Sequence, residues 1–452
     1  MPYLIRNATA IFSPDQPDAT ALRIDGNRIA ALGRDLDPQV GDTVIDARGG
    51  IVYPGLVNTH HHLAQSILKG VPEGLNQGLG DWLGSVPYRF WPQITPELMY
   101  HAARLGLYEL LRSGTTTCAD HHYLYHRDTP DELEDAVWQA ADELGIRLVL
   151  CRGSAVEKGS HKGLGRHNIE PESTDQVIDR MERTRTRYHQ TAPDAMRRLV
   201  VAPTSLIHSS PPDFLKEMAA YARGNGLRMH SHLLEVGFDE VQAREKFDMA
   251  AIDYAESCDF LGPDVWFAHL VQSDPHAIER LAATGTGIAH CPTSNCRLGS
   301  GVAPVIEMAG KSVPVSIGVD GSASAESGSM LQELNLTWLI HRALHGPDAT
   351  TLEQVLQWGS RDGARLLGLE ATGELAVGQA ADLAIYDIDS PRFAGVHTPL
   401  FAPLMCGEPV SVSHSFVDGK PVVEDGSVLG LDEQKLVENV RAGLADLMTR
   451  VT

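Results

Sequence analysis

Cysteine is scarce in this chain and forms no recognisable pattern. Six cysteines occur in 452 residues, and no two of them stand in a CxxC arrangement. Such pairs mark structural zinc knuckles and redox motifs, and dense cysteine marks disulfide scaffolds. Cys291 and Cys296 could be metal ligands by spacing alone, but packing is the simpler interpretation. We therefore expect Cys291 and Cys296 to be small buried hydrophobic side chains, and we expect neither disulfides nor a structural zinc knuckle from the six residues Cys118, Cys151, Cys258, Cys291, Cys296 and Cys406.

Positive charge is also in short supply. The chain has 37 Lys and Arg against 59 Asp and Glu, which gives a formal net charge of -22. Proteins that bind nucleic acids carry Lys and Arg patches that neutralise backbone phosphates. The composition therefore argues against a nucleic-acid partner and against a polyanionic ligand.

Long apolar runs are missing as well. No window holds eighteen consecutive apolar residues, and the opening MPYLIRNATAIF has no basic segment before an apolar core. These features predict neither a membrane segment nor a signal peptide. With 43% hydrophobic and 21% charged residues, the composition is that of a well-packed globular protein. We expect a cytoplasmic protein with no membrane partner.

The stretch PGLVNTHHHLA, residues 54–64, is the most informative part of the chain. A short apolar run from Gly50 to Asn58 reads as a buried strand that leads into three histidines. Alternate strand side chains share a face, so His60 and His62 point one way and His61 the other. Two imidazoles at this spacing suit a divalent metal, although a plain histidine cluster would look the same. We interpret His61 as structural.

From Pro54 onward, strand and helix patterns alternate. A helix is expected after the cap Thr95-Pro96 and should end at Gly114, and another should end at Gly145. Eight strand segments can be counted along this part of the chain, and this alternation predicts an α/β fold with a parallel (β/α)8 barrel. The first strand leads into His60, and the others are residues 115–120, 146–151, 198–202, 227–232, 265–269, 287–290 and 314–320.

The two ends of the chain carry further strand patterns. Residues 3–12, 21–32 and 43–53 read as strands, the second folded into a hairpin at Asp25-Gly26-Asn27, and short strands return near the C-terminus. We interpret residues 1–53 and 373–430 as two parts of a small discontinuous β-sandwich domain. The TIM barrel, residues 54–372, is inserted in it. Residues 431–452 are expected to form a C-terminal helix.

Several of the barrel's strands end on residues that can bind metal or transfer protons. His230 and His232 share a strand face, so spacing alone does not choose between them, but His232 lies nearer the strand end and precedes Glu235. His269 and Asp320 end two later strands. Three neutral imidazoles and one carboxylate leave room for water, as in a catalytic zinc site, and the ion would lower the pKa of that water. Zinc is the first choice for one divalent ion, and iron also suits such ligands.

Seven ordered motifs give the chain a family resemblance. They are PGLVNTHHH, SGTTTCADHH, MHSHLLE, WFAHL, AHCPTSNCRLGSG, SIGVDGSAS and GELAVGQAADL. The chain resembles the amidohydrolase superfamily, in its cytosine deaminase, guanine deaminase and chlorohydrolase branch. The resemblance implies an enzyme that hydrolyses a C-N bond and removes an amino group from a ring.

The resemblance also implies roles for individual residues. His60, His62, His232 and Asp320 would hold one metal ion, and Glu235 and His269 would be acid/base groups. Asp320 could in addition accept the proton of the attacking water. A two-metal site would usually need a lysine near the end of the fourth strand, and RRLVVAPTSLIH has none. His208 in that segment reads as a loop residue.

The substrate expectation depends on weaker signals. The segments DHHYLYH and CRGSAVEKGSHKGLG resemble most the subgroup of isoxanthopterin and 8-oxoguanine deaminases. Gln65 could read a lactam edge as donor and acceptor, and Trp82, Tyr88 and Trp91 could stack on a bicyclic ring or form a hydrophobic lid. The candidate substrate contacts are Gln65, Tyr88, Arg152 and Asn295. Thr293 stands where related deaminases often have glutamine. The sequence therefore does not show which edge of the substrate ring is recognised at this position.

We expect isoxanthopterin to be the substrate of this small-molecule enzyme, with 8-oxoguanine or guanine as the alternative. A second alternative is a triazine chloro- or aminohydrolase, which uses the same metal ligands. Outside enzymes, the alternative is a non-catalytic assembly protein of the same fold, which would typically lack some ligands. The family resemblance also suggests a homo-oligomer.

Overall fold

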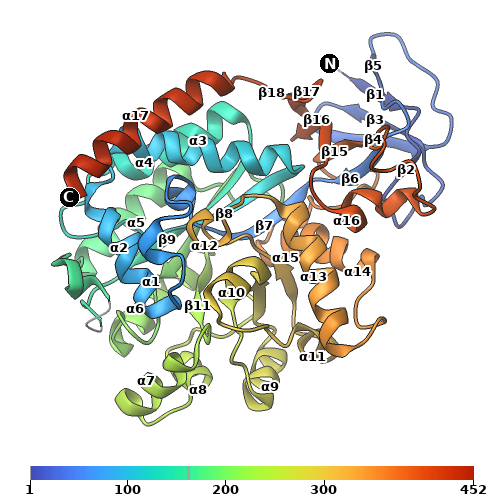
Figure 1. The fold of residues 1–452 in the computed structure, drawn as a ribbon. Coiled ribbons are helices and arrows are strands. Elements are labelled where there is room, and N and C mark those ends of the chain that lie inside the picture. The colour runs from blue at the N-terminus through green and yellow to red at the C-terminus, as the bar shows by residue number, and fades with distance from the viewer. Residues whose placement is uncertain (1, 160–162, 452) are drawn as a thin grey trace.

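A closed ring of eight parallel strands forms the centre of the molecule. The computed structural model describes residues 2–159 and 163–451, so Ser160, His161 and Lys162 of the segment CRGSAVEKGSHKGLG lie outside the described residues. The strands follow one another around the ring in chain order (Figure 1). They are β7 (Leu56–His61), β8 (Thr115–His122), β9 (Arg147–Ser154), β10 (Arg197–Pro203), β11 (Arg228–Leu233), β12 (Val265–His269), β13 (Gly287–His290) and β14 (Val315–Ile317). This arrangement confirms the predicted (β/α)8 barrel.

The first and last strands meet just beyond the end of β14. The backbone N-H of Asp320 donates to the carbonyl of His60 at 3.0 Å, and His61 and Asp320 form an isolated parallel bridge. Gly318 permits this approach, because a Cβ there would lie 2.8 Å from the Cβ of His60. Barrel closure therefore places the end of the last strand against the histidines of the first.

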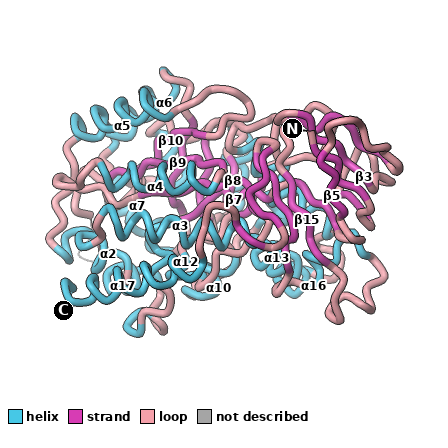
Figure 2. The backbone as a smooth tube through the Cα atoms, turned by 90° about the horizontal axis from the view of Figure 1, so that it is seen from above, coloured by secondary structure: helices cyan, strands magenta, loops and turns pink. Residues whose placement is uncertain are grey.

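Helices surround the ring, as expected for a barrel in which each strand is followed by a helical segment (Figure 2). The predicted cap holds, since the Thr95 hydroxyl accepts from the backbone N-H of Leu98, and Gly145 ends its helix with φ +70°. The longer helices are α3 (Pro96–Arg112), α4 (Glu132–Leu144), α5 (Thr174–Tyr188), α6 (Pro212–Gly224), α7 (Gly237–Phe247), α9 (Pro275–Thr284), α13 (Met330–His345) and α17 (Glu433–Val451). The shorter ones are α1 (Leu79–Ser85), α2 (Pro87–Phe90), α8 (Ala251–Ser257), α10 (Pro292–Leu298), α11 (Val305–Gly310), α12 (Ser322–Ala325), α14 (Leu352–Gln357), α15 (Gly363–Leu366) and α16 (Ala402–Cys406).

A small two-sheet domain is built from both ends of the chain. One sheet has the order β4-β3-β1-β5, and the other has the order β18-β17-β16-β15-β6-β2. Residues from both sheets, among them Ile5, Leu22, Val52, Ile385 and Phe416, share one buried cluster, so the sheets pack as a sandwich. The strands are β1 (Tyr3–Arg6), β2 (Ala10–Ile11), β3 (Ala21–Asp25), β4 (Arg28–Gly33), β5 (Thr43–Asp46), β6 (Ile51–Pro54), β15 (Leu383–Asp387), β16 (Ser411–Val417), β17 (Lys420–Glu424) and β18 (Ser427–Val428).

The run from Gly50 to Asn58 is divided, which corrects the prediction of a single strand. Its first half is β6 in the sandwich, and its second half is β7 in the barrel. The chain passes from one to the other at Gly55, where a Cβ would lie 2.1 Å from the Thr116 hydroxyl of β8. The apolar pattern alone reads as one strand, whereas the expected boundary between the small domain and the barrel, after residue 53, falls close to this change of sheet.

The cysteines and the helices bear on two further expectations from the sequence. Cys291 is buried as predicted, but Cys296 is exposed, so the expectation was wrong for Cys296. Among the described residues, no helix combines the length and apolar character needed to cross a membrane.

A buried ion pair joins the barrel to the sandwich. Arg147 at the start of β9 donates to Asp382, just before β15, at 2.8 Å, and both side chains are excluded from solvent. The other carboxylate oxygen of Asp382 accepts from the backbone N-H of Asp418 at 2.7 Å. The pair links segments that are 235 residues apart in sequence.

We expect Asp382→Asn to lower the free energy of unfolding by about 3–5 kcal/mol, because it leaves the Arg147 guanidinium buried without its counterion. Denaturant unfolding followed by circular dichroism measures this. Asp18→Asn, which breaks the exposed Arg34–Asp18 pair, is the control and should change nothing measurable. Wild-type stability in the Asp382 variant would contradict a structural role for the pair.

Candidate active site

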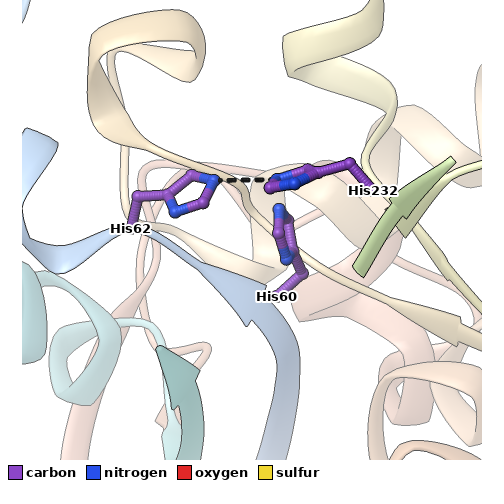
Figure 3. A group of neighbouring side chains, drawn as sticks. All are labelled: His60, His62 and His232. Carbon is purple, nitrogen blue, oxygen red and sulfur yellow. Dashed lines mark hydrogen bonds between the residues drawn. The ribbon is translucent and has the colours of Figure 1, made fainter. Parts of the chain in front are cut away.

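Three histidines from two distant strands meet at the mouth of the barrel. His60 and His62 come from β7 and its end, and His232 comes from β11, and one ring nitrogen of each lies within 4.8 Å of the others. Figure 3 shows the three rings turned toward one another. The strand-end positions follow from the fold, since active sites of such barrels form at the carboxyl ends of the strands.

Hydrogen bonds to backbone carbonyls fix which nitrogen of each ring carries the proton. The Nδ1 of His62 donates to the carbonyl of His121 at 2.7 Å, and the Nδ1 of His232 donates to the carbonyl of Thr204 at 2.9 Å. Burial lowers the pKa of both rings, so each is neutral and has one proton. Their Nε2 atoms, 3.2 Å apart, therefore face each other as two lone pairs.

Asp320 adds a carboxylate to this cluster. Its Oδ1 lies 3.4 Å from the Nε2 of His60 and 3.3 Å from that of His62. Its Oδ2 accepts from the hydroxyl groups of Ser294 and Ser324. The serines hold one oxygen and leave the other directed at the imidazoles.

The donor set fits a divalent metal. The Nε2 of His60 is buried and has no hydrogen-bond partner among the described residues. Unpaired buried lone pairs are costly, and several of them converging with a carboxylate would repel one another without a cation between them. Three imidazole nitrogens and one carboxylate oxygen are a common ligand set for a catalytic zinc or iron ion.

His269 and Glu235 lie beside this cluster. The Nε2 of His269 is 3.6 Å from a carboxylate oxygen of Glu235, and its Nδ1 donates to the amide oxygen of Asn295 at 2.9 Å. Burial raises the pKa of Glu235 to about 7. Burial alone would lower the pKa of His269, but the nearby Glu235 and Asp320 carboxylates raise it above its usual value. A carboxyl with this pKa beside an imidazole with a raised pKa is suited to acid/base chemistry.

Backbone strain accompanies these positions. His269 and Asp320 have φ values of +75° and +59°, and Leu234, which precedes Glu235, has +54°. Non-glycine residues adopt such values at a cost of about 1–3 kcal/mol, and they cluster at functional sites. The left-handed turns end the strands and redirect the side chains toward the barrel mouth.

Glu235 is held through its backbone by a neighbouring pair. The Oδ2 of Asp239, in the first turn of α7, accepts from the N-H of Glu235 at 3.3 Å, and its Oδ1 accepts from the Nε2 of His208 at 2.9 Å. His208 lies in a turn, as the sequence suggested, and it also lines the cavity.

A cavity of about 510 Å³ opens over the cluster. The candidate contacts Gln65 and Tyr88 line it, together with Trp82, Trp91 and Tyr123. The Nε2 of Gln65 donates to the Tyr123 hydroxyl at 3.0 Å, and its Oε1 has no partner among the described residues. That oxygen is buried against Gly321, and the aromatic walls of the cavity suit a flat heterocycle.

The other two candidate contacts lie elsewhere. Arg152 forms a fully buried double hydrogen bond with Glu172 at 2.7 and 2.8 Å and stacks on Tyr125, and it is not among the residues that line the cavity. Asn295 is buried behind His269 and does not line the cavity either. The structure thus brings Gln65 and Tyr88 to the cavity and leaves Arg152 and Asn295 behind its wall.

Sequence reasoning missed several supporting residues. Ser294 and Ser324 lie inside the quoted motifs AHCPTSNCRLGSG and SIGVDGSAS, but nothing in a serine's position shows that it will meet Asp320. Asp239 carried a usable signal, since an acid in the first turn of a helix often accepts from a nearby backbone N-H.

Known proteins resemble this chain along its whole length. The sequence profile of the amidohydrolase family matches residues 51–422. An isoxanthopterin deaminase from an unknown prokaryotic organism is 42% identical over 99% of this chain and 98% of its own. An 8-oxoguanine deaminase from Pseudomonas aeruginosa is 38% identical over 98% of both chains. The solved structure of atrazine chlorohydrolase from Arthrobacter aurescens TC1 complexed with zinc has a TM-score of 0.91 at 30% identity, and the match covers 98% of this chain and 100% of that one.

We expect the purified protein to contain a tightly bound divalent ion, and His62→Ala and His232→Ala to weaken its binding by more than about 100-fold, because each removes a lone pair from the cluster. Elemental analysis after dialysis measures this. His276→Ala, which breaks an exposed His276–Asp253 pair, is the matched control and should keep the ion. Full metal content in a folded His232 variant would contradict the site.

Proposed function

The chain belongs to the amidohydrolase family, and from this membership we propose that it is a metal-dependent hydrolase that removes the amino group of an oxidised pterin or purine ring. The observation that carries the proposal is the convergence of three imidazole lone pairs and one carboxylate below an aromatic cavity. We assign His60, His62, His232 and Asp320 as the ligands of one ion. Zinc is our choice because the donor set suits it and because the related chlorohydrolase structure contains zinc.

When bound, a divalent ion of this kind lowers the pKa of water toward neutrality and so supplies the nucleophile. The overall reaction adds water to the ring carbon that carries the amino group and releases ammonia, leaving a carbonyl. As charge builds on the neighbouring ring nitrogen, Glu235 donates a proton to it. A buried carboxyl with a pKa of about 7 is protonated in a useful fraction of molecules at neutral pH.

The other proton transfers fall to His269 and Asp320. The Asp320 carboxylate accepts the proton of the attacking water and passes it to the departing amine. His269 is held by Asn295, so its Nε2 can hydrogen-bond the attacking oxygen. Its distance of 3.6 Å from Glu235 places the two acid/base groups on the same side of the cluster.

Isoxanthopterin is our proposed substrate, and 8-oxoguanine is the next candidate. Both are flat, oxidised bicycles with an exocyclic amine between ring nitrogens, and the two deaminases to which the chain is 42% and 38% identical bear these names. Gln65 lines the cavity, and Tyr88 and Trp91 offer ring faces there. The product of isoxanthopterin would be a hydroxylated pterin of the 7-oxolumazine type.

A triazine hydrolase remains the second candidate, because the related atrazine chlorohydrolase has the same fold at 30% identity. The non-catalytic alternative loses support, since the full set of four donors is present. The expectations of a cytoplasmic location and of a homo-oligomer remain predictions.

We expect zinc-loaded enzyme to release ammonia fastest from isoxanthopterin, with 8-oxoguanine next and guanine lower by about 100-fold in kcat/KM, because guanine lacks the second lactam group. A coupled ammonia assay over these rings, cytosine and hydroxylated triazines measures this. A preference for the triazines would favour the second candidate. Metal-loaded protein that releases no ammonia from any of these rings would overturn the deaminase proposal.

We expect Glu235→Gln to lower kcat by about 10²–10⁴-fold while metal content stays at the wild-type level, because the amide cannot supply a proton to the ring. Steady-state kinetics with elemental analysis of the same sample measures both. Glu245→Gln, an exposed carboxylate on α7, is the matched control. Near-wild-type kcat in the Glu235 variant would remove the residue from the mechanism.

A further inference from the structure

His230 shares a strand with His232 but belongs to a different part of the site. Its ring is fully buried and lies against His60, with the Nε2 of His230 2.8 Å from the Nδ1 of His60. The Nδ1 of His230 lies 2.9 Å from the carbonyl oxygen of Trp266 on β12. His230 thus connects the backbone of one barrel strand to an imidazole of another.

The protons along this chain of contacts can be assigned from its fixed end. A carbonyl oxygen only accepts, so the Nδ1 of His230 must carry a proton. Burial favours the neutral form of the His230 ring, which has one proton, so the Nε2 of His230 is a lone pair. The 2.8 Å contact is therefore a hydrogen bond in which the Nδ1 of His60 donates. His60, neutral as well, is left with a lone pair on the Nε2 that faces Asp320.

We propose that His230 is a positioning residue that holds His60 in the tautomer and orientation in which its Nε2 can bind the metal ion. Backbone carbonyls hold His62 and His232 in the same way, by accepting from their Nδ1 atoms. Among the described contacts, no carbonyl accepts from the Nδ1 of His60. His230 replaces that carbonyl. The inference depends on the metal site of the proposed function, and it does not depend on which ring is the substrate.

Trp266 contacts both His230 and the strand that carries His60. Its indole ring stacks on His230 with centroids 4.5 Å apart and planes 19° apart. Its Nε1 donates to the carbonyl of Thr59, the residue before His60, at 3.1 Å. One tryptophan therefore holds His230 through its carbonyl and its ring, and holds the strand of His60 through its indole N-H.

The same geometry argues against a second ion. His60, His121 and His230 also bring ring nitrogens within 4.8 Å of one another. However, the lone pair of His230 already accepts from His60, and the Nε2 of His121 donates to the carbonyl of Ala202 at 3.0 Å. A second ion there would have to displace the protons that set the tautomers.

The test is zinc affinity in His230→Gln and His230→Met. Gln can place its Oε1 near the position of the lost Nε2 and accept from His60, whereas Met fills similar space with no comparable acceptor. Apo protein is titrated with zinc in competition with a chromophoric chelator, with no substrate present. We expect the Met variant to bind zinc about 10–100-fold more weakly, as for other groups that orient metal ligands, and the Gln variant to recover most of the loss. Wild type should bind one equivalent.

His341→Asn is the matched control, because it also removes a buried contact between two imidazoles, that of His341 with His290 at 3.2 Å, outside the ligand set. It should leave zinc affinity unchanged. Wild-type affinity in the Met variant, equal weakness of the Gln and Met variants, or a fall from two bound ions to one would each overturn the proposal. These readouts are separate from ammonia release, so failure of the substrate proposal would leave them intact.

If the Met variant does not fold, histidine-selective ¹⁵N NMR of the wild-type protein provides the second measurement. The proposal requires a protonated Nδ1 on His60 and an unprotonated Nε2 on His230, and the His230→Gln variant identifies the His230 signals by their loss. The reverse arrangement of protons would overturn it.

Discussion

The mutual repulsion of lone pairs at the barrel mouth is the constraint on which the rest of the structure depends. Carbonyls behind His62 and His232 accept the Nδ1 protons, so the Nε2 atoms come within 3.2 Å of each other with no proton between them. Asp320 adds negative charge to the same point. A fold held together without a cation gains nothing from this arrangement, because burying unpaired acceptors is costly. The surrounding residues hold the donors in place for an ion.

The contact that closes the barrel also sets the geometry of the site. Asp320 follows the last strand, and its backbone N-H donates to the carbonyl of His60 on the first. A change that loosened the contact between these strands would therefore also move two of the proposed ligands relative to each other. The absence of a Cβ at Gly318, directly against His60, fits this reading, since any side chain there would separate the strands. Stability and metal binding should be coupled for this reason.

The fold was predictable because its signals are local. Strand segments, caps and the hairpin at Gly26 depend on neighbouring residues, and the structure places them close to the expected positions. What could not be predicted depends on partners far along the chain. The alternation of side chains along a strand could not show which of His230 and His232 binds the metal. Their hydrogen bonds to the carbonyls of Trp266 and Thr204 distinguish the two rings. Arg152 stands at a strand end like a substrate contact, but Glu172 pairs with it.

The two carboxylates of the site have different surroundings, and this difference supports the separate roles that we propose for them. Asp320 receives hydrogen bonds from Ser294 and Ser324 and faces imidazoles, and such partners stabilise the ionised form. Glu235 is buried beside the aromatic cavity, and desolvation raises its pKa to about 7. One carboxylate is thereby suited to accept a proton from water, and the other to deliver one to the ring. Enzymes that need an acid and a base at the same pH commonly separate two carboxyl groups in this way.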